Sequence, residues 1–152
     1  MSANTITQTT VQVYQVFIKA TPEAIWEAIT KPEFTRKYFH GVGVESTAER
    51  RVTQWGEETG EDPVFEFDPP RRLVHGWHSK WNDELNAEEP SRVTWEIESR
   101  DGGITMLTVV HDQLEGAPKT AASVYGPGWM MVLSGLKTLL ETGHPLTTEK
   151  AD

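Results

Sequence analysis

The order of secondary-structure signals predicts an α+β fold, in which one curved antiparallel sheet of about six strands packs on a long C-terminal helix. An alternating strand signal comes first and is followed at once by two short helix signals. The middle of the chain holds a run of alternating segments separated by turn residues. The last part repeats apolar residues at three- and four-residue spacing. A helix with such a stripe must bury it on the sheet, which gives a sandwich of one sheet and one main helix.

A strand and two short helices are predicted at the start of the chain. Residues 11–19, "VQVYQVFIK", alternate well enough to form a strand. In "TPEAIWEAIT", Thr21 is a good N-cap, Pro22 fits the first turn, and Glu23 suits the positive end of the helix dipole. The next segment, "KPEFTRKYF", restarts with Pro32 and so predicts a second short helix after a break.

The middle of the chain alternates between strand signals and polar turns. The predicted strands cover residues 42–46, 51–55, 64–67, 73–80, 92–98 and 104–111. The segments between them include an acidic turn, "GEETGED", a proline pair in "FDPPRR", a polar loop, "NDELNAEEP", and a tight turn, "RDGG". Residues 116–126 fit either a loop or a short helix.

A long amphipathic helix is predicted to close the domain. It begins at Pro127 or Gly128, while Gly143 is a good C-terminal cap and Pro145 prevents continuation. Its apolar stripe consists of Trp129, Val132, Leu133, Leu136, Leu139 and Leu140.

Length and composition predict a single globular domain. The chain has 152 residues, of which 24% are charged and 37% hydrophobic, which fits one packed core. We place that domain at residues 11–145, between a disordered tail at 1–10 and a flexible tail at 146–152. The net charge of −9 argues against nucleic-acid and anionic-membrane partners, because both require a basic surface.

Several chemistries and locations are excluded by what the sequence lacks. There is no cysteine, which removes disulfides, zinc-thiolate sites and a cysteine nucleophile. No run of 18 apolar residues could span a membrane. The first residues, "MSANTITQTT", lack the charged and apolar regions of a secretory signal, so a cytoplasmic location is expected.

The stretch "FDPPRRLVHGWHSKW" concentrates histidine and tryptophan in one predicted strand. Side chains of a strand alternate between its two faces, so His75 and Trp77 point one way and His78 the other. Two histidines on opposite faces are not positioned to bind one metal ion. The stretch is therefore interpreted as one wall of a cavity, with His75 and Trp77 facing in and His78 facing out.

Four segments taken in order carry a resemblance to a known family. They are "IKATPEAIWEAITKPEFTRKYF", "VFEFDPPRRLVHGW", "SRVTWEIESRDGGITMLTVVHDQL" and "GPGWMMVLSGLKTLLETG". Together they resemble the START-like (SRPBCC) superfamily and, within it, the AHSA-type family of the activator of heat shock protein 90 ATPase homologue. The resemblance runs from about residue 11 to 143. It implies the helix-grip (START/Bet v-like) fold, a curved antiparallel sheet wrapped on a long C-terminal helix.

The resemblance leaves the chemistry open. Members of the family include chaperone co-factors, small-ligand binders and proteins with no assigned activity, so the fold does not determine the function. The eukaryotic activators also carry a separate N-terminal domain that engages the chaperone, for which 152 residues leave no room. Chaperone activation is therefore not the expected function.

The predicted interior has the composition of a small-molecule pocket. Trp95 belongs to the apolar face of its strand, and the family pattern favours an inward position for the face of the last strand that carries His111. The candidate ligand-binding residues are His75, Trp77, Trp95, Leu107, Val109, His111, Trp129 and Leu133. The same residues would also make an ordinary packed core with two hydrogen-bonded histidines.

Three functions follow as hypotheses. The first is binding of a small hydrophobic ligand, aromatic or lipid-like, between the sheet and the long helix. The second is a protein-interaction or chaperone-associated module, or a homodimer, that uses the outer face of the sheet or the acidic loops. The third is a cyclase- or aromatase-like enzyme with His75 or His111 as base. The sequence assigns no catalytic residue, no metal and no cofactor.

Overall fold

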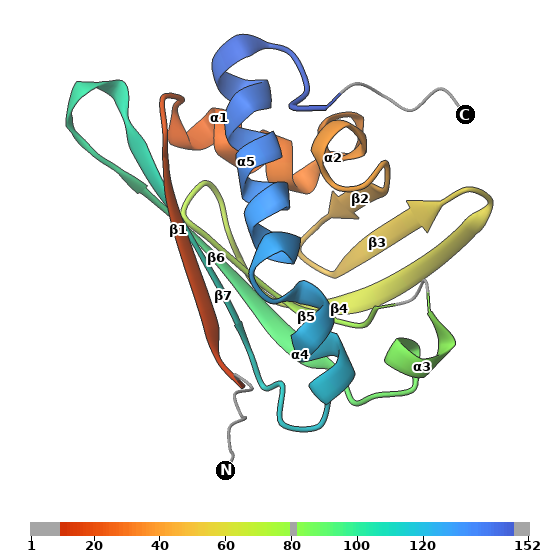
Figure 1. The fold of residues 1–152 in the computed structure, drawn as a ribbon. Helices are drawn as coiled ribbons and strands as arrows, with labels where there is room; N and C mark the ends of the chain where they lie inside the picture. Colours follow the sequence, from red (N-terminus) through yellow and green to blue (C-terminus); the bar gives the residue numbers. More distant parts are fainter. Residues whose placement is uncertain (1–9, 80–81, 148–152) are drawn as a thin grey trace.

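In the computed structural model, which describes residues 10–79 and 82–147, a seven-stranded antiparallel sheet curves around one long helix (Figure 1). The strand order is β1-β7-β6-β5-β4-β3-β2, so β1 and β2 form the two edges. The predicted α+β class and helix-grip arrangement are confirmed, with seven strands where about six were expected.

The elements follow the predicted order. The strands are β1 (Gln12–Ile18), β2 (Gly43–Ser46), β3 (Arg50–Trp55), β4 (Glu58–Asp68), β5 (Arg72–Trp77), β6 (Ser91–Ser99) and β7 (Thr105–Asp112). The helices are α1 (Pro22–Thr30), α2 (Pro32–Tyr38), α3 (Asp83–Asn86), α4 (Pro118–Val124) and α5 (Pro127–Thr142), with a 3-10 turn at Asp101–Gly103.

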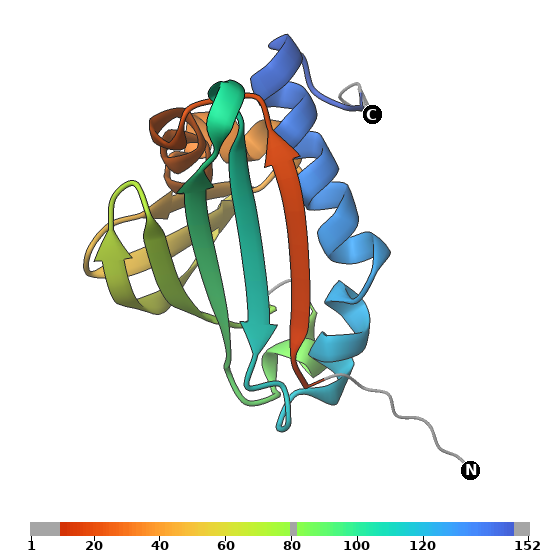
Figure 2. The same ribbon diagram turned by 90° about the vertical axis from the view of Figure 1, so that its left-hand side faces the viewer.

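The helices α1, α2 and α5 lie on the concave side of the sheet (Figure 1), whereas the outer faces of β1, β7 and β6 are left uncovered in the view of Figure 2. The core therefore sits between the concave face and the helices. Its largest fully buried side chains include Trp129, Ile18, Ile25, Leu73, Leu107 and Leu136. The burial of these apolar surfaces is the main term that holds the two layers together.

The helix caps predicted at Thr21 and Gly143 are present in the structure. The Thr21 hydroxyl accepts a hydrogen bond from the backbone N–H of Ala24 at 3.1 Å, which satisfies a donor of the first turn of α1. The long helix begins at Pro127, after Gly126 with a φ of +61°. It ends at Gly143, whose left-handed backbone (φ +82°) lets its N–H reach the Leu139 carbonyl.

The acidic stretch "GEETGED" is not a turn, which corrects the prediction. The turn is confined to residues 56–57, and β4 begins at Glu58. The cross-strand register, from Trp55 opposite Glu58 to Arg51 opposite Asp62, shows that the stretch pairs with β3. Glutamates that point to solvent on a hairpin are compatible with a strand, so counting charges misidentified an exposed strand as a loop.

Smaller differences concern the ends of elements. Strand β5 ends at Trp77, and Lys80, the expected strand end, lies outside the described residues. The polar loop contains the short helix α3, and the open segment at 116–126 contains α4. The predicted tails lie outside the description except for residues 10, 146 and 147. Within the described ranges, no helix is long and apolar enough to cross a membrane.

Candidate ligand-binding site

The eight residues predicted to line a pocket lie together on the concave face, and all are buried. Their side chains come from β5, β6, β7 and α5, and their exposed fractions are at most 4%: His75, Trp77, Trp95, Leu107, Val109, His111, Trp129 and Leu133. The rings pack closely, with centroid distances of 5.7 Å for Trp77–Trp129 and 5.5 Å for Trp95–Trp129. This part of the interior is filled by the protein's own side chains.

Two hydrogen bonds fix the tautomer of His75. The Trp95 indole N–H donates to His75 Nε2 at 2.9 Å, and His75 Nδ1 lies 2.8 Å from the Gly76 carbonyl oxygen. An indole nitrogen only donates, so Nε2 is the acceptor and Nδ1 carries the proton that reaches the carbonyl. The side chain is fully buried, which favours the uncharged ring.

His111 has the same kind of arrangement with the opposite tautomer. The Trp129 indole N–H donates to His111 Nδ1 at 3.1 Å, and His111 Nε2 lies 2.8 Å from the Ser91 hydroxyl. Nε2 therefore carries the proton and donates to Ser91. Burial lowers the pKa of His111 to about 3, while the Asp112 charge opposes the shift and the Arg51 charge adds to it.

These hydrogen bonds determine whether His75 or His111 can act as a general base. A general base needs a lone pair that can reach the substrate. In both histidines the acceptor nitrogen already takes an indole N–H, and the other nitrogen donates to a protein oxygen. The geometry suits residues that orient Trp95 and Trp129 in the core.

A cavity of about 410 Å³ lies beside this cluster, on the far side of Trp77. It is bounded by the segment after α2, by β3, by the end of β5 and by the α4–α5 corner. Its lining residues are Phe39, His40, Val42, Arg51, Thr53, Trp55, Trp77, His78, Ser123 and Gly128. A smaller space of about 70 Å³ continues from it toward Trp129 and Val132.

The cavity includes one of the eight predicted residues, Trp77, and the smaller space adds Trp129. Sequence reasoning missed the contribution of β3. A signal was present: Arg51, Thr53 and Trp55 occur at every second position of "RRVTQW", so they share one face of the strand. That face forms one wall of the cavity.

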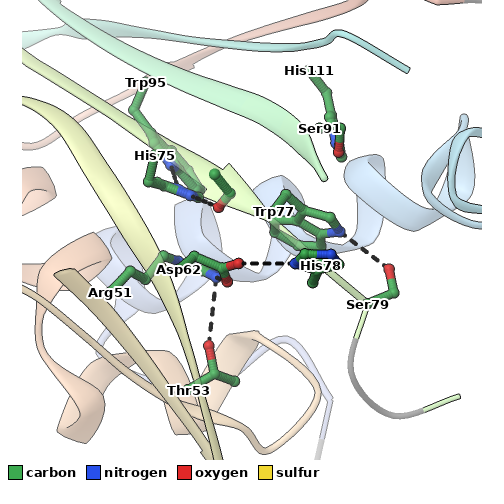
Figure 3. Close-up of polar contacts among 11 residues, drawn as sticks. Arg51, Thr53, Asp62, His75, Trp77, His78, Ser79, Ser91, Trp95 and His111 are labelled. Atoms are coloured by element: carbon green, nitrogen blue, oxygen red, sulfur yellow. Dashed lines mark hydrogen bonds and ion pairs between the residues drawn. The ribbon is translucent and has the colours of Figure 1, made fainter. Parts of the chain in front are cut away.

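The structure corrects the orientation of His78. It was predicted to face away from the cavity, yet it lines the cavity wall. The reason is that β5 ends at Trp77, so the alternation of a strand no longer fixes the direction of the next side chain. Figure 3 shows His78 pointing toward Asp62, and His78 Nδ1 lies 3.6 Å from Asp62 Oδ1.

Arg51 and Asp62 place two charged side chains in this region, with exposed fractions of only 6% and 1%. Arg51 Nη1 lies 3.8 Å from Asp62 Oδ2 and 3.5 Å from the Thr53 hydroxyl (Figure 3). The guanidinium carbon lies 5.1 Å from the centre of the Trp77 ring. Burial lowers the pKa of Arg51 to about 10, with the Asp62 charge opposing, so the side chain stays charged at neutral pH.

A second cavity of about 460 Å³ lies between α2, α5 and residues 145–147. Arg36 and Lys37 contribute to its wall along with the backbone of Gly41 and Gly135. We consider the first cavity the better candidate site, because it combines three aromatic rings with two histidines and a buried arginine. In the described ranges, no group of three or more His, Asp or Glu side chains could hold a metal ion.

Comparisons with known proteins agree with this architecture. The family model described as "Activator of Hsp90 ATPase homolog 1-like protein" matches residues 19–141. Among proteins with curated descriptions, none matches the sequence.

Solved structures with the same fold share little sequence with this chain. The protein MLL2253 from Mesorhizobium loti has a TM-score of 0.68 at 18% identity, covering 86% of this chain and 96% of its own. CalU16 from Micromonospora echinospora has a TM-score of 0.67 at 21% identity, with 89% and 76% covered. The solution structure of the Aha1 dimer from Colwellia psychrerythraea has a TM-score of 0.68 at 16% identity, with 89% and 98% covered. The family model matches 123 of the 152 residues. The chain therefore belongs to the family of activator of Hsp90 ATPase homolog 1-like proteins.

Proposed function

We propose that the protein binds a small hydrophobic ligand with an aromatic body in the cavity lined by β3, β5 and the α4–α5 corner. The observation that supports the proposal is the cavity itself, whose volume of about 410 Å³ is in the usual range for small-molecule sites. Trp55, Trp77 and Phe39 offer flat apolar surfaces, while Arg51 and His78 offer polar groups that could orient a ligand.

This proposal moves the site away from the middle of the predicted cluster. Trp77 stays a ligand-contacting residue, and Trp129 borders the inner end of the space. For His75, Trp95 and His111 we propose a supporting role, because their polar atoms are used within the core. A rigid core behind Trp77 keeps that ring in position for a ligand.

The experiment is to fill the cavity from its rim. Ser123 on α4 lines the cavity and is exposed, so Ser123→Phe should occupy the space with little effect on the core. The matched control is Ala122→Phe, an exposed neighbour on the same helix that is not among the lining residues. Binding is measured by tryptophan fluorescence and thermal melting with 2-naphthol, 2-naphthamide and 2-naphthoate.

At least one of these bicyclic probes should raise the melting temperature of the unmodified protein with dose, because binding to the native state stabilises it by mass action. Ser123→Phe should weaken that binding at least tenfold, and Ala122→Phe should leave it unchanged. Failure of all three probes at millimolar concentration, or equal binding by both variants, would contradict the proposal.

A second candidate function is self-association through the outer face of the sheet. Val13 and Phe17 on β1 are 56% and 55% exposed. The cross-strand register places Val110 opposite Val13 and Met106 opposite Phe17 on β7, which extends the apolar surface. Figure 2 shows this face free of helices, and exposed apolar patches often mark protein contacts. The similar structure from Colwellia psychrerythraea is described as a dimer.

A further inference from the structure

Arg51 is a buried cation whose hydrogen-bonding capacity is largely unused by the residues that the structure describes. A guanidinium has five N–H donors. Those of Arg51 make one long hydrogen bond, 3.5 Å to Thr53, and a 3.8 Å ion pair with Asp62. Buried ion pairs are normally held by close, well-aligned hydrogen bonds, because the desolvation of a charge is costly.

Another arginine of the same sheet shows what a close, two-point ion pair looks like. Arg92 on β6 contacts Asp112 on β7 through two hydrogen bonds, Nε to Oδ1 at 2.9 Å and Nη2 to Oδ2 at 2.7 Å. The two residues are directly opposite in the register, as Arg51 and Asp62 are. The Arg92–Asp112 pair therefore has the shorter contact, 2.7 Å, although it is more exposed and water could also hydrogen-bond to it. The buried Arg51–Asp62 pair is separated by 3.8 Å.

The position of the Arg51 guanidinium explains why Asp62 does not engage all of its N–H donors. The Arg51 side chain extends over the rings of Trp77 and Phe39, with its central carbon 5.1 Å and 5.9 Å from the ring centres. Asp62 has a short side chain, and its Oδ1 also faces His78 at 3.6 Å. Arg51 therefore presents donors at the cavity wall beside an aromatic surface.

We infer that the cavity selects ligands in which a carboxylate is attached to an aromatic body. This inference rests on the proposed function and adds the chemical class of the ligand. The planar carboxylate accepts two parallel N–H bonds from Arg51, which is the geometry that guanidinium groups favour. The aromatic body lies against Trp77, Phe39 and Trp55, whose rings provide the apolar wall.

The charges around the guanidinium define the selectivity. Asp62 competes with a ligand carboxylate for Arg51, and among the described residues His78, Tyr38 and His111 are further titratable groups that interact with this pair. Removing the Asp62 charge should therefore strengthen binding of an anionic ligand and leave a neutral one unaffected. An effect of this sign would not arise from a damaged fold, which weakens both.

The experiment compares 2-naphthoate with 2-naphthamide, two probes of nearly the same shape, at pH 7 by fluorescence titration. The unmodified protein should bind 2-naphthoate about tenfold to a hundredfold more tightly, as a charge-assisted hydrogen bond of about 1.5–3 kcal/mol implies. Asp62→Asn should increase that ratio. Arg51→Gln should reduce the ratio to near one, and the control Arg50→Gln, an exposed neighbour on β3, should not change it.

The outcomes separate the two proposals. Equal affinity for both probes in the unmodified protein would overturn the inference and leave the hydrophobic site in place. An unchanged or smaller ratio in Asp62→Asn would also overturn it, whatever the stability of Arg51→Gln. Failure of these two probes and of 2-naphthol to bind the folded protein would contradict the proposed function itself, whereas binding of 2-naphthol alone would overturn only the inference.

Discussion

His111 shows how much a single buried side chain can affect stability. Its ring is neutral in the folded protein, with Nδ1 accepting from Trp129 and Nε2 donating to Ser91. Burial lowers its pKa from 6.5 to about 3. Between these two values the unfolded chain binds a proton that the folded protein does not, so folding becomes less favourable as the pH falls.

We predict that His111 contributes a slope of up to about 1.4 kcal/mol per pH unit to the unfolding free energy between pH 6.5 and pH 3. The contribution is fully present above pH 6.5 and is lost progressively toward pH 3. Urea unfolding at several pH values measures the slope. His111→Gln should show a shallower dependence, because its amide does not titrate.

The matched substitution His144→Gln, at an exposed position after α5, controls for changes that any lost imidazole would bring. Parallel stability curves for the unmodified protein and His111→Gln would contradict the prediction. The carboxylates whose pKa is lowered by hydrogen bonds, Glu88 and Glu141, contribute equally to all three proteins and cancel in the comparison.

At the scale of elements, the joint between α4 and α5 forms one rim of the cavity. Gly128 lies in the first turn of α5, and a Cβ atom at this position would sit 2.9 Å from the Ser123 carbonyl oxygen on α4. Both residues line the cavity. The absence of a side chain at Gly128 therefore allows the two helices to approach closely and defines the rim.

We predict that Gly128→Ala lowers the unfolding free energy by about 1–3 kcal/mol, the usual cost of forcing extra volume into a packed contact. The conflicting atom belongs to the backbone, so it has no rotamer by which to avoid the new methyl group. Helix propensity alone would instead favour alanine by about 1 kcal/mol. Urea unfolding measures whether Gly128→Ala raises or lowers the unfolding free energy. A stabilised variant would contradict the close contact between Gly128 and Ser123.

Ser134→Ala is the control for helix propensity, since Ser134 is an exposed residue of the same helix. It should leave stability unchanged or raise it slightly. If Ser134→Ala and Gly128→Ala had the same effect, the α4–α5 contact would not be what constrains position 128.

The ends of the helices and strands show which boundaries can be predicted from local sequence signals and which cannot. The Thr21 cap and the Gly143 stop were predictable, because each depends on residues within one turn of the helix end. The start of β4 was not, because the acidic residues after Gly56 become a strand only through pairing with β3. Pairing across strands is a tertiary effect that overrides local composition.

At the scale of the whole molecule, the order of elements was enough to predict the fold class. Alternation predicted the buried face of β6, and the family resemblance favoured the buried face of β7. The cavity was harder to place. It forms where β3, the end of β5 and the α4–α5 corner meet, and these segments are far apart in the sequence. Trp77 could be predicted as a lining residue because it belongs to both the core and the cavity wall. The role of Arg51 could not be predicted, because it depends on the curvature of the sheet that brings β3 toward α4.

The outer face of β1 and β7 leads to a prediction about assembly. Lys137 on α5 donates to the Phe17 carbonyl at 2.7 Å, which occupies an acceptor of the edge strand. Contact through the side chains of the outer face is therefore favoured over strand addition at that edge. A two-fold pairing would bury Phe17 and Val13 of both copies, since such an interface uses the same patch twice.

We predict that the protein forms a dimer that Phe17→Lys disrupts, while Phe65→Lys on β4, a residue that is also exposed (62%), does not. Glu96 and Glu98 on β6 lie on the same outer face, with Glu98 opposite Met106, so the two copies would bring like charges together. Salt screens such repulsion, and the dimer should tighten as ionic strength rises. Sedimentation equilibrium over a range of concentrations measures both effects. A protein that stays monomeric at high concentration and high salt, or a Phe17→Lys variant that still dimerises, would show that this face has another role.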